Sequence, residues 1–77
     1  MYIHIGADTV LRSRDIVAIF DATILKQQKE LAQGPNWLEL GNVKSVVLTP
    51  TRIYGSPISC ATLHKRLTQQ PNLESET

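Results

Sequence analysis

The most constraining feature of this chain is a run of five apolar residues, Ile16 to Phe20. A β-strand directs successive side chains to opposite faces of its sheet, so an apolar residue at every position requires that both faces be covered. In a chain of only 77 residues, we expect a helix to cover one face and a neighbouring subunit to cover the other. The run therefore predicts a buried strand in a small, oligomeric protein.

The length of the chain gives a second argument for oligomerisation. A domain of this size gains little more from apolar burial than it loses in chain entropy, and commonly needs a disulfide, a metal or a partner chain. Cys60 is the single cysteine, which excludes an internal disulfide, and no Cys, His and acidic residues have metal-ligand spacing. We therefore expect no cofactor and an assembly of identical subunits. The expected interface residues are Ile16, Ala18, Phe20, Trp37 and Tyr54.

The apolar pattern predicts an α+β domain with a small antiparallel sheet and two helices, in the order β-β-β-α-β-β-α. Asp21 is expected to cap a helix over 22–33, which Gly34 and Pro35 end, and Ser59 to cap a second helix over 60–69. The segments with strand character are 2–5, 9–11, 16–20, 44–49 and 52–54.

The chain shows no sign of a membrane or secreted protein. It has no apolar segment long enough to span a bilayer, and its first residues lack the basic and apolar regions of a signal peptide. A lone cysteine is typical of a reducing compartment, so we expect a cytoplasmic protein that does not bind membranes. Residues 1–69 are expected to form one domain, followed by a disordered tail over 70–77.

None of the reactive residues belongs to a catalytic motif. His4, Asp21 and Ser59 lack the Gly-x-Ser-x-Gly elbow of a hydrolase, and Ser59 already serves as a predicted helix cap. Cys60 falls on the inner face of the second predicted helix, and His64 has no second metal ligand in view. We therefore expect no enzyme, no metal site and no small-molecule substrate.

Positively charged residues remain as candidates for a binding site. The formal net charge is +1, and Glu74 and Glu76 fall in the predicted tail, so the folded part is modestly basic. One interpretation is a solvated surface that keeps a small protein soluble. The other is that basic residues converge at one rim of the sheet and bind phosphates. The residues concerned are Arg12, Arg14 and Lys44, with Arg52 as a further candidate.

The succession of these segments resembles the extracellular matrix regulatory protein family of Gram-positive bacteria, the RemA/RemB family, and its B-type members more than its A-type. The likeness lies in the order and spacing of segments over nearly the whole chain, not in any single motif. The segments that carry it are 2–6, 14–21, 44–49, 53–59 and 62–67.

The resemblance implies a LytTR-like fold that assembles into a closed ring of identical subunits, octamer-like or similar. It also implies binding of double-stranded DNA and regulation of transcription of biofilm and matrix genes. A-type relatives contact DNA through an arginine just before the all-apolar strand, here Arg14, and through arginines before the Val-Val strand, where only Lys44 is positively charged. Repetition around a ring multiplies phosphate contacts that are weak singly.

Two other functions are also considered. The first is an adaptor ring that binds protein partners through Trp37, Tyr54 and neighbouring apolar residues, with the basic residues serving solubility only. Salt separates this function from DNA binding, because phosphate contacts weaken steeply as salt rises and apolar contacts do not. The second is RNA binding by base stacking, which is disfavoured because the chain has four aromatic residues and none alternates with basic ones.

Overall fold

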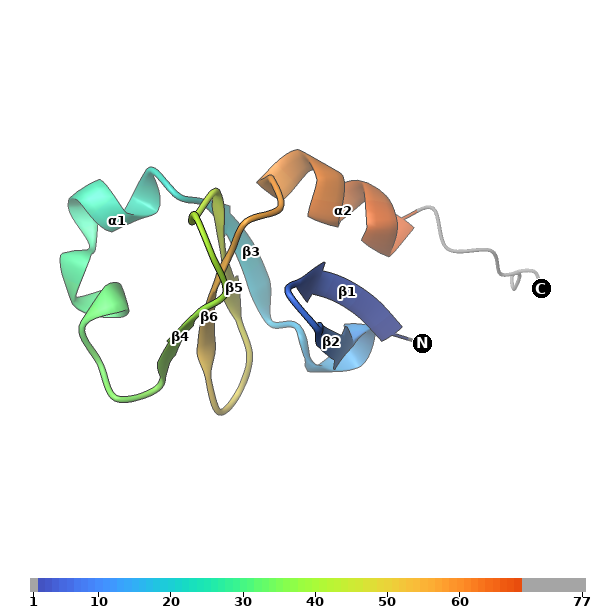
Figure 1. Cartoon of the computed structure of the whole chain (residues 1–77), viewed down its shortest axis with the longest axis horizontal. Helices are drawn as coiled ribbons and strands as arrows, with labels where there is room; N and C mark the ends of the chain where they lie inside the picture. Colours follow the sequence, from blue (N-terminus) through green and yellow to red (C-terminus); the bar gives the residue numbers. More distant parts are fainter. Residues whose placement is uncertain (1, 69–77) are drawn as a thin grey trace.

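The fold of residues 2–68, which are the part of the chain described by the computed structural model, consists of two small sheets and two α-helices (Figure 1). This confirms the predicted α+β class. The two helices and most strands follow the predicted order, with one additional strand before the fourth predicted one. The predicted tail over 70–77 lies outside the described residues.

The chain begins with an antiparallel hairpin of β1 (Tyr2–Gly6) and β2 (Thr9–Arg12), which forms a two-stranded sheet of its own. Its side chains alternate as the sequence predicts. Ile3 and Ile5 are buried on one face, whereas Tyr2 and His4 are exposed on the other. The inner face of the hairpin therefore belongs to the core, and its outer face is free to present polar groups.

The second sheet has four strands in the order β3-β5-β6-β4, which are Ala18–Asp21, Ser45–Leu48, Ile53–Ser56 and Trp37–Glu39. The three longer strands are antiparallel, as predicted, but β4 pairs in parallel with β6. The prediction of a single antiparallel sheet is therefore wrong. A strand of three residues has too little alternation to be recognised locally, and it forms here because Leu40 N–H bonds to Gly55 and Ile53 N–H bonds to Asn36.

The all-apolar run is only partly covered within one subunit. Strand β3 begins at Ala18, and Ile19 is buried in the core at 9% exposure. Phe20, which points to the opposite face, retains 39% of its surface. Val17, just before the strand, retains 68%. One face of the run 16–20 is thus covered within the chain, as predicted. Other side chains of the run stay exposed in a single subunit.

The first predicted helix, over 22–33, is instead two short pieces. Helix α1 spans Ile24–Gln27 and a 3-10 helix, η2, spans Lys29–Ala32, with Gln28 between them at φ −125° and ψ 66°. Asp21 is the last residue of β3 and not the predicted N-cap, although its carboxylate accepts a 3.4 Å hydrogen bond from the N–H of Thr23. A segment with few apolar anchors packs too little surface to hold a continuous helix.

The second helix, α2, spans Cys60–Thr68 and begins as predicted. The hydroxyl of Ser59 accepts the N–H of Thr62 at 3.2 Å, which is the bond of an N-cap residue. Leu63 is fully buried. Within residues 2–68, no helix has the length and apolar character needed to cross a lipid bilayer.

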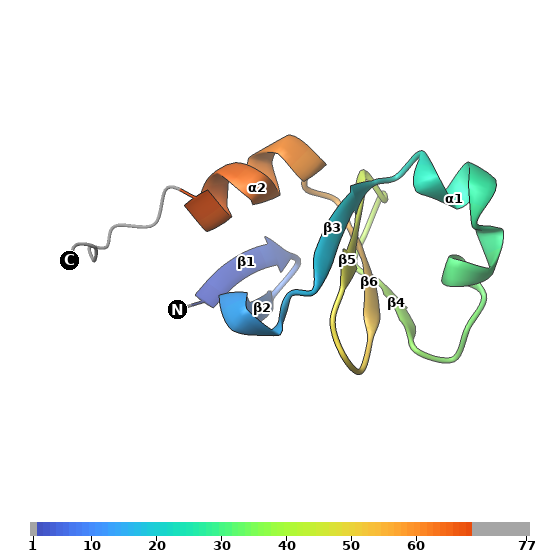
Figure 2. The ribbon, with the colours of Figure 1, turned by 180° about the vertical axis from the view of Figure 1, so that it is seen from behind.

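The core lies between the four-stranded sheet, the hairpin and α2. Figures 1 and 2 show α2 and the hairpin on one side of the sheet and α1 with η2 on the other. The apolar interior is shared by the four-stranded sheet, the hairpin and α2, because each of them contributes at least one buried side chain. Its buried residues are Ile3, Ile5, Ile19, Val47, Tyr54 and Leu63.

Two fully buried serines connect these elements by hydrogen bonds. The hydroxyl of Ser56, in β6, donates to the carbonyl of Ile5 in β1 and accepts the N–H of Ile58 at 3.0 Å. Ser45, its partner across β5 and β6, donates to the carbonyl of Ile58 at 2.7 Å. The sheet, the hairpin and the segment leading to α2 are thereby joined at one buried point.

We expect Gly6→Ala to lower the free energy of unfolding by roughly 2–4 kcal/mol. Gly6 has φ +136°, and a Cβ added there would lie 2.5 Å from Cδ of Pro57, so both backbone and neighbour must shift. The measurement is urea denaturation at fixed protein concentration. Gly34→Ala is the matched control, because a Cβ there meets nothing within 4 Å. An equal effect of the two substitutions would contradict this account of Gly6.

We expect Ser56→Ala to lower the free energy of unfolding by roughly 1–3 kcal/mol, because it leaves the carbonyl of Ile5 without the hydroxyl donor and the N–H of Ile58 without its acceptor. Thermal unfolding followed by circular dichroism measures the destabilisation. Ser13→Ala is the control, since it removes a half-buried hydroxyl outside the core and should change stability by less than about 0.5 kcal/mol. A wild-type unfolding midpoint for Ser56→Ala would show that the hydroxyl does not hold the hairpin.

Candidate nucleic-acid interface

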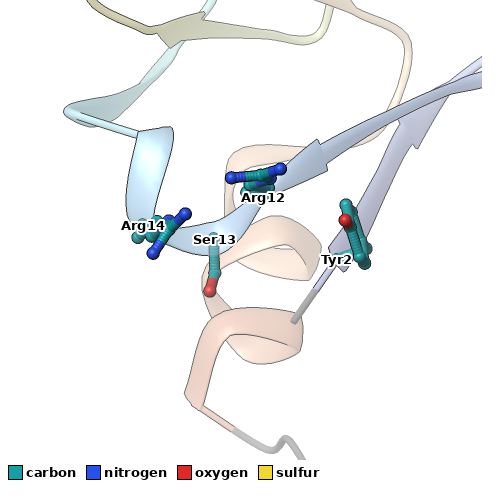
Figure 3. A pocket seen from close by; sticks show the side chains of 4 residues that line it. All are labelled: Tyr2, Arg12, Ser13 and Arg14. Carbon is teal, nitrogen blue, oxygen red and sulfur yellow. The ribbon is translucent and has the colours of Figure 1, made fainter.

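Two of the four predicted DNA-binding residues lie in one pocket. Arg12 ends β2, and Arg14 lies in the 3-10 helix η1 (Ser13–Asp15), which follows directly. Both side chains are exposed, and with Tyr2 and Ser13 they line an open cavity of about 350 Å3 (Figure 3). This part of the predicted convergence of basic residues is present in the structure.

The local geometry explains why these residues share a pocket. Tyr2 and Arg12 are direct partners across the hairpin, and both point to its outer face because Ile3 points inward. The chain then turns in η1, which the N–H of Ile16 closes by bonding to the carbonyl of Ser13 at 3.2 Å. This turn allows Arg14, two residues beyond Arg12, to line the same cavity.

Lys44 lies at the other end of the sheet. The antiparallel register pairs Ala18 with Leu48 and Asp21 with Ser45, so the residues before β3 and those before β5 are at opposite ends. The N–H of Ala22, next to α1, bonds to the carbonyl of Lys44 at 3.1 Å. Within one subunit, the predicted convergence of Lys44 with the two arginines at one rim is therefore wrong, because neighbouring antiparallel strands begin at opposite edges. DNA binding by Lys44 itself stays a prediction.

Arg52 lies at the same end of the sheet as Arg14. It belongs to the turn between β5 and β6, where its N–H bonds to the hydroxyl of Thr49 at 3.0 Å and its carbonyl accepts the N–H of Thr49 at 2.9 Å. This turn and Asp15, the neighbour of Arg14, line a second cavity of about 380 Å3. Three of the four predicted basic residues thus gather at this end.

Arg66 is exposed on α2 and also has a structural partner. Its Nη1 donates to the carbonyl of His4 at 2.7 Å, which ties α2 to β1. By contrast, sequence reasoning missed Tyr2 and Ser13 as members of the pocket. The signal for Tyr2 was its place on the polar face of the first strand, but its pairing with Arg12 depends on the register of the hairpin.

The predicted interface residues have different environments. Ile16 and Ala18 are half-buried near the edge strand β3, where Phe20 is exposed. Trp37 is half-buried and packs so closely on Gly55 that a Cβ there would lie 2.6 Å from the indole ring. Tyr54 is in the core at 9% exposure. The side chains near β3 therefore keep the surface that an interface needs, and Tyr54 has little left.

The residues with reactive side chains, which belong to no catalytic motif, have local structural partners. His4 Nε2 lies 2.7 Å from the carbonyl oxygen of Ala7, and the Ser59 hydroxyl caps α2. The thiol of Cys60 is half-buried, 3.9 Å from the carbonyl oxygen of Ile19. Within the described range 2–68, no three Cys, His, Asp or Glu side chains are grouped to hold a metal ion.

The fold and the pocket define a small α+β protein with a basic site at one end. Comparison with known proteins identifies the family to which it belongs. No model of a protein family matches the sequence. The chain is 43% identical over 76 residues to Extracellular matrix regulatory protein B of Bacillus subtilis (strain 168), in an alignment that covers 86% of this chain and 89% of that relative. The chain belongs to the extracellular matrix regulatory protein family of the RemA/RemB type, as its segment order indicated.

Proposed function

We propose that this protein regulates the transcription of extracellular-matrix and biofilm genes in the cytoplasm by binding double-stranded DNA. Its family membership supports the regulatory role, since the relative is named a regulator of the extracellular matrix. The observation that carries DNA binding is the placement of Arg12 and Arg14 in one polar pocket. Guanidinium groups bind phosphate oxygens through paired, directional N–H donors.

The elements around the pocket favour contact through strands and turns, as in a LytTR-like domain. Helix α2 buries Leu63, and Nη1 of its Arg66 donates to the carbonyl of His4 in β1, so part of this guanidinium is already engaged. The hairpin and η1 instead carry their arginines outward. Base-specific contacts should then be few, and the choice of DNA site depends on groove shape and bendability.

We further propose that the active form is a closed ring of identical subunits. Strand β3 is an edge of the four-stranded sheet, and apolar surface is exposed at Val17, just before the strand, and at Phe20, within it. An edge strand with exposed apolar side chains favours association with another chain. Each subunit in a ring brings few phosphate contacts, and the assembly sums them into useful affinity.

Exposed apolar residues also support the alternative, an adaptor that binds protein and little DNA. Val17 and Leu38 are 68% and 39% exposed, at the two edges of the sheet. The residues first considered for such a surface, Trp37 and Tyr54, are half-buried and buried. The two functions differ in their response to salt, because apolar contacts lack the counterion release of phosphate contacts.

We expect Arg14→Ala to weaken binding to a labelled AT-rich duplex about tenfold or more at low salt. It should also reduce the slope of log affinity against log salt by about 0.9 for each phosphate that the variant no longer neutralises. Fluorescence anisotropy between about 50 and 200 mM salt measures both quantities. Lys29→Ala is the matched control, because it removes an exposed positive charge from η2, on the other side of the sheet from the hairpin. Unchanged affinity and slope in Arg14→Ala would show that the assigned surface is wrong.

We expect Val17→Asp to convert the assembly into smaller species in sedimentation velocity. A charge introduced into a desolvated contact is costly, whereas a side chain that is 68% exposed in one subunit is not needed for its fold. Val10→Asp, at 51% exposure on the outer face of the hairpin, is the control for added charge. A wild-type protein that sediments as an 8.6 kDa monomer would contradict the ring.

A further inference from the structure

We infer that the pocket of Tyr2, Arg12, Ser13 and Arg14 is a binding site for a single phosphodiester group. Two neutral hydroxyls and two guanidinium groups would bind it together. The proposal rests on the proposed function for the source of the phosphate, the backbone of DNA. It adds to that function the residues that hold the phosphate and the reason that Lys44 is not among them.

The lining of the pocket has the chemistry of an anion site. Each of its four side chains carries a hydrogen-bond donor, and none is a carboxylate. They come from β1, β2 and η1, so three elements of the fold supply donors to the lining (Figure 3). Phosphodiester oxygens only accept hydrogen bonds, and a donor-rich lining matches them better than it matches a base edge, which mixes donors and acceptors.

Within the part of the chain that the structure describes, the hydroxyls of Tyr2 and Ser13 have no protein partner that would compete with such a role. Other serines in the fold have partners, since Ser45 and Ser56 donate to carbonyls and Ser59 caps α2. Within residues 2–68, by contrast, neither the Ser13 hydroxyl nor the Tyr2 phenol forms a hydrogen bond with another residue. Tyr2 is also 64% exposed, so its ring adds little to the core.

The register of the hairpin makes Arg12 the second positive charge of the site. Arg12 faces Tyr2 directly across β1 and β2, and η1 adds Arg14. Lys44 is at the opposite end of the sheet and cannot reach the same phosphate within one subunit. The pair Arg12 and Arg14 therefore supplies locally the charge that a single lysine before β5 cannot supply.

The decisive experiment compares neutral and charged members of the pocket in duplex binding. Tyr2→Phe combined with Ser13→Ala should weaken binding about tenfold and leave the salt slope unchanged, because no charge is removed and no counterion release is altered. Arg12→Ala should weaken binding and also reduce the slope by about 0.9 for each engaged pocket. Thr51→Ala, which removes an exposed hydroxyl from the neighbouring cavity, should bind as the wild type does.

The outcomes separate this inference from the proposed function. If Arg14→Ala weakens binding and the Tyr2→Phe, Ser13→Ala variant does not, the phosphodiester-binding site is overturned and the proposal of DNA binding is retained. An equal weakening in Thr51→Ala also overturns it. Unfolding midpoints of all variants should match the wild type, since none of these side chains is in the core.

A second readout applies if the wild type binds no duplex, an outcome that would remove the proposed function. Inorganic phosphate is then titrated into the labelled protein and followed by amide chemical shifts. Saturable shifts that are confined to Tyr2 and residues 12–14, and that are abolished in Ser13→Ala, support the phosphate-binding site without DNA. The absence of such shifts overturns it.

Discussion

The position of the hairpin depends on one buried hydrogen bond, from the hydroxyl of Ser56 to the carbonyl of Ile5. No backbone ladder joins the two-stranded sheet to the four-stranded one within residues 2–68, so side chains must hold them together. The close contact of Gly6 with Pro57, the bond from Arg66 to the carbonyl of His4 and the apolar packing of the core add to that connection. Because one wall of the basic pocket belongs to the hairpin, the geometry of the site depends on this buried serine.

Strand direction then decides which charges act together. Residues that precede two neighbouring antiparallel strands lie at opposite ends of the sheet, and this separates Lys44 from Arg14. Residues that are opposite each other on the hairpin share a face, and this joins Arg12 to Tyr2. The proposed DNA contact is therefore concentrated at one end of each subunit. A ring of such subunits would present a repeated series of single-phosphate contacts, which suits recognition of DNA shape better than recognition of bases.

Sequence patterns predicted the elements whose signal is local. The alternation of Ile3 and Ile5 with polar neighbours predicted the first strand, and Ser59 predicted the start of α2. The helix over 22–33 was predicted as one piece because propensity does not show that Gln28 leaves helical geometry. Strand β4 was missed because its three residues pair only when β6 is already present beside them. The pairing that decides β4 thus comes from residues distant in sequence.

The sequence by itself determined the family, the α+β class, the faces of the first strand and the candidacy of Arg14. These follow from residue spacing, because the period of a strand is a property of its own backbone. Only the tertiary structure decided that Tyr2 and Ser13 join the arginines in one pocket and that Lys44 does not. Strand order and register are set by the packing of the whole core, and no local pattern along the chain encodes which end of the sheet a residue will occupy.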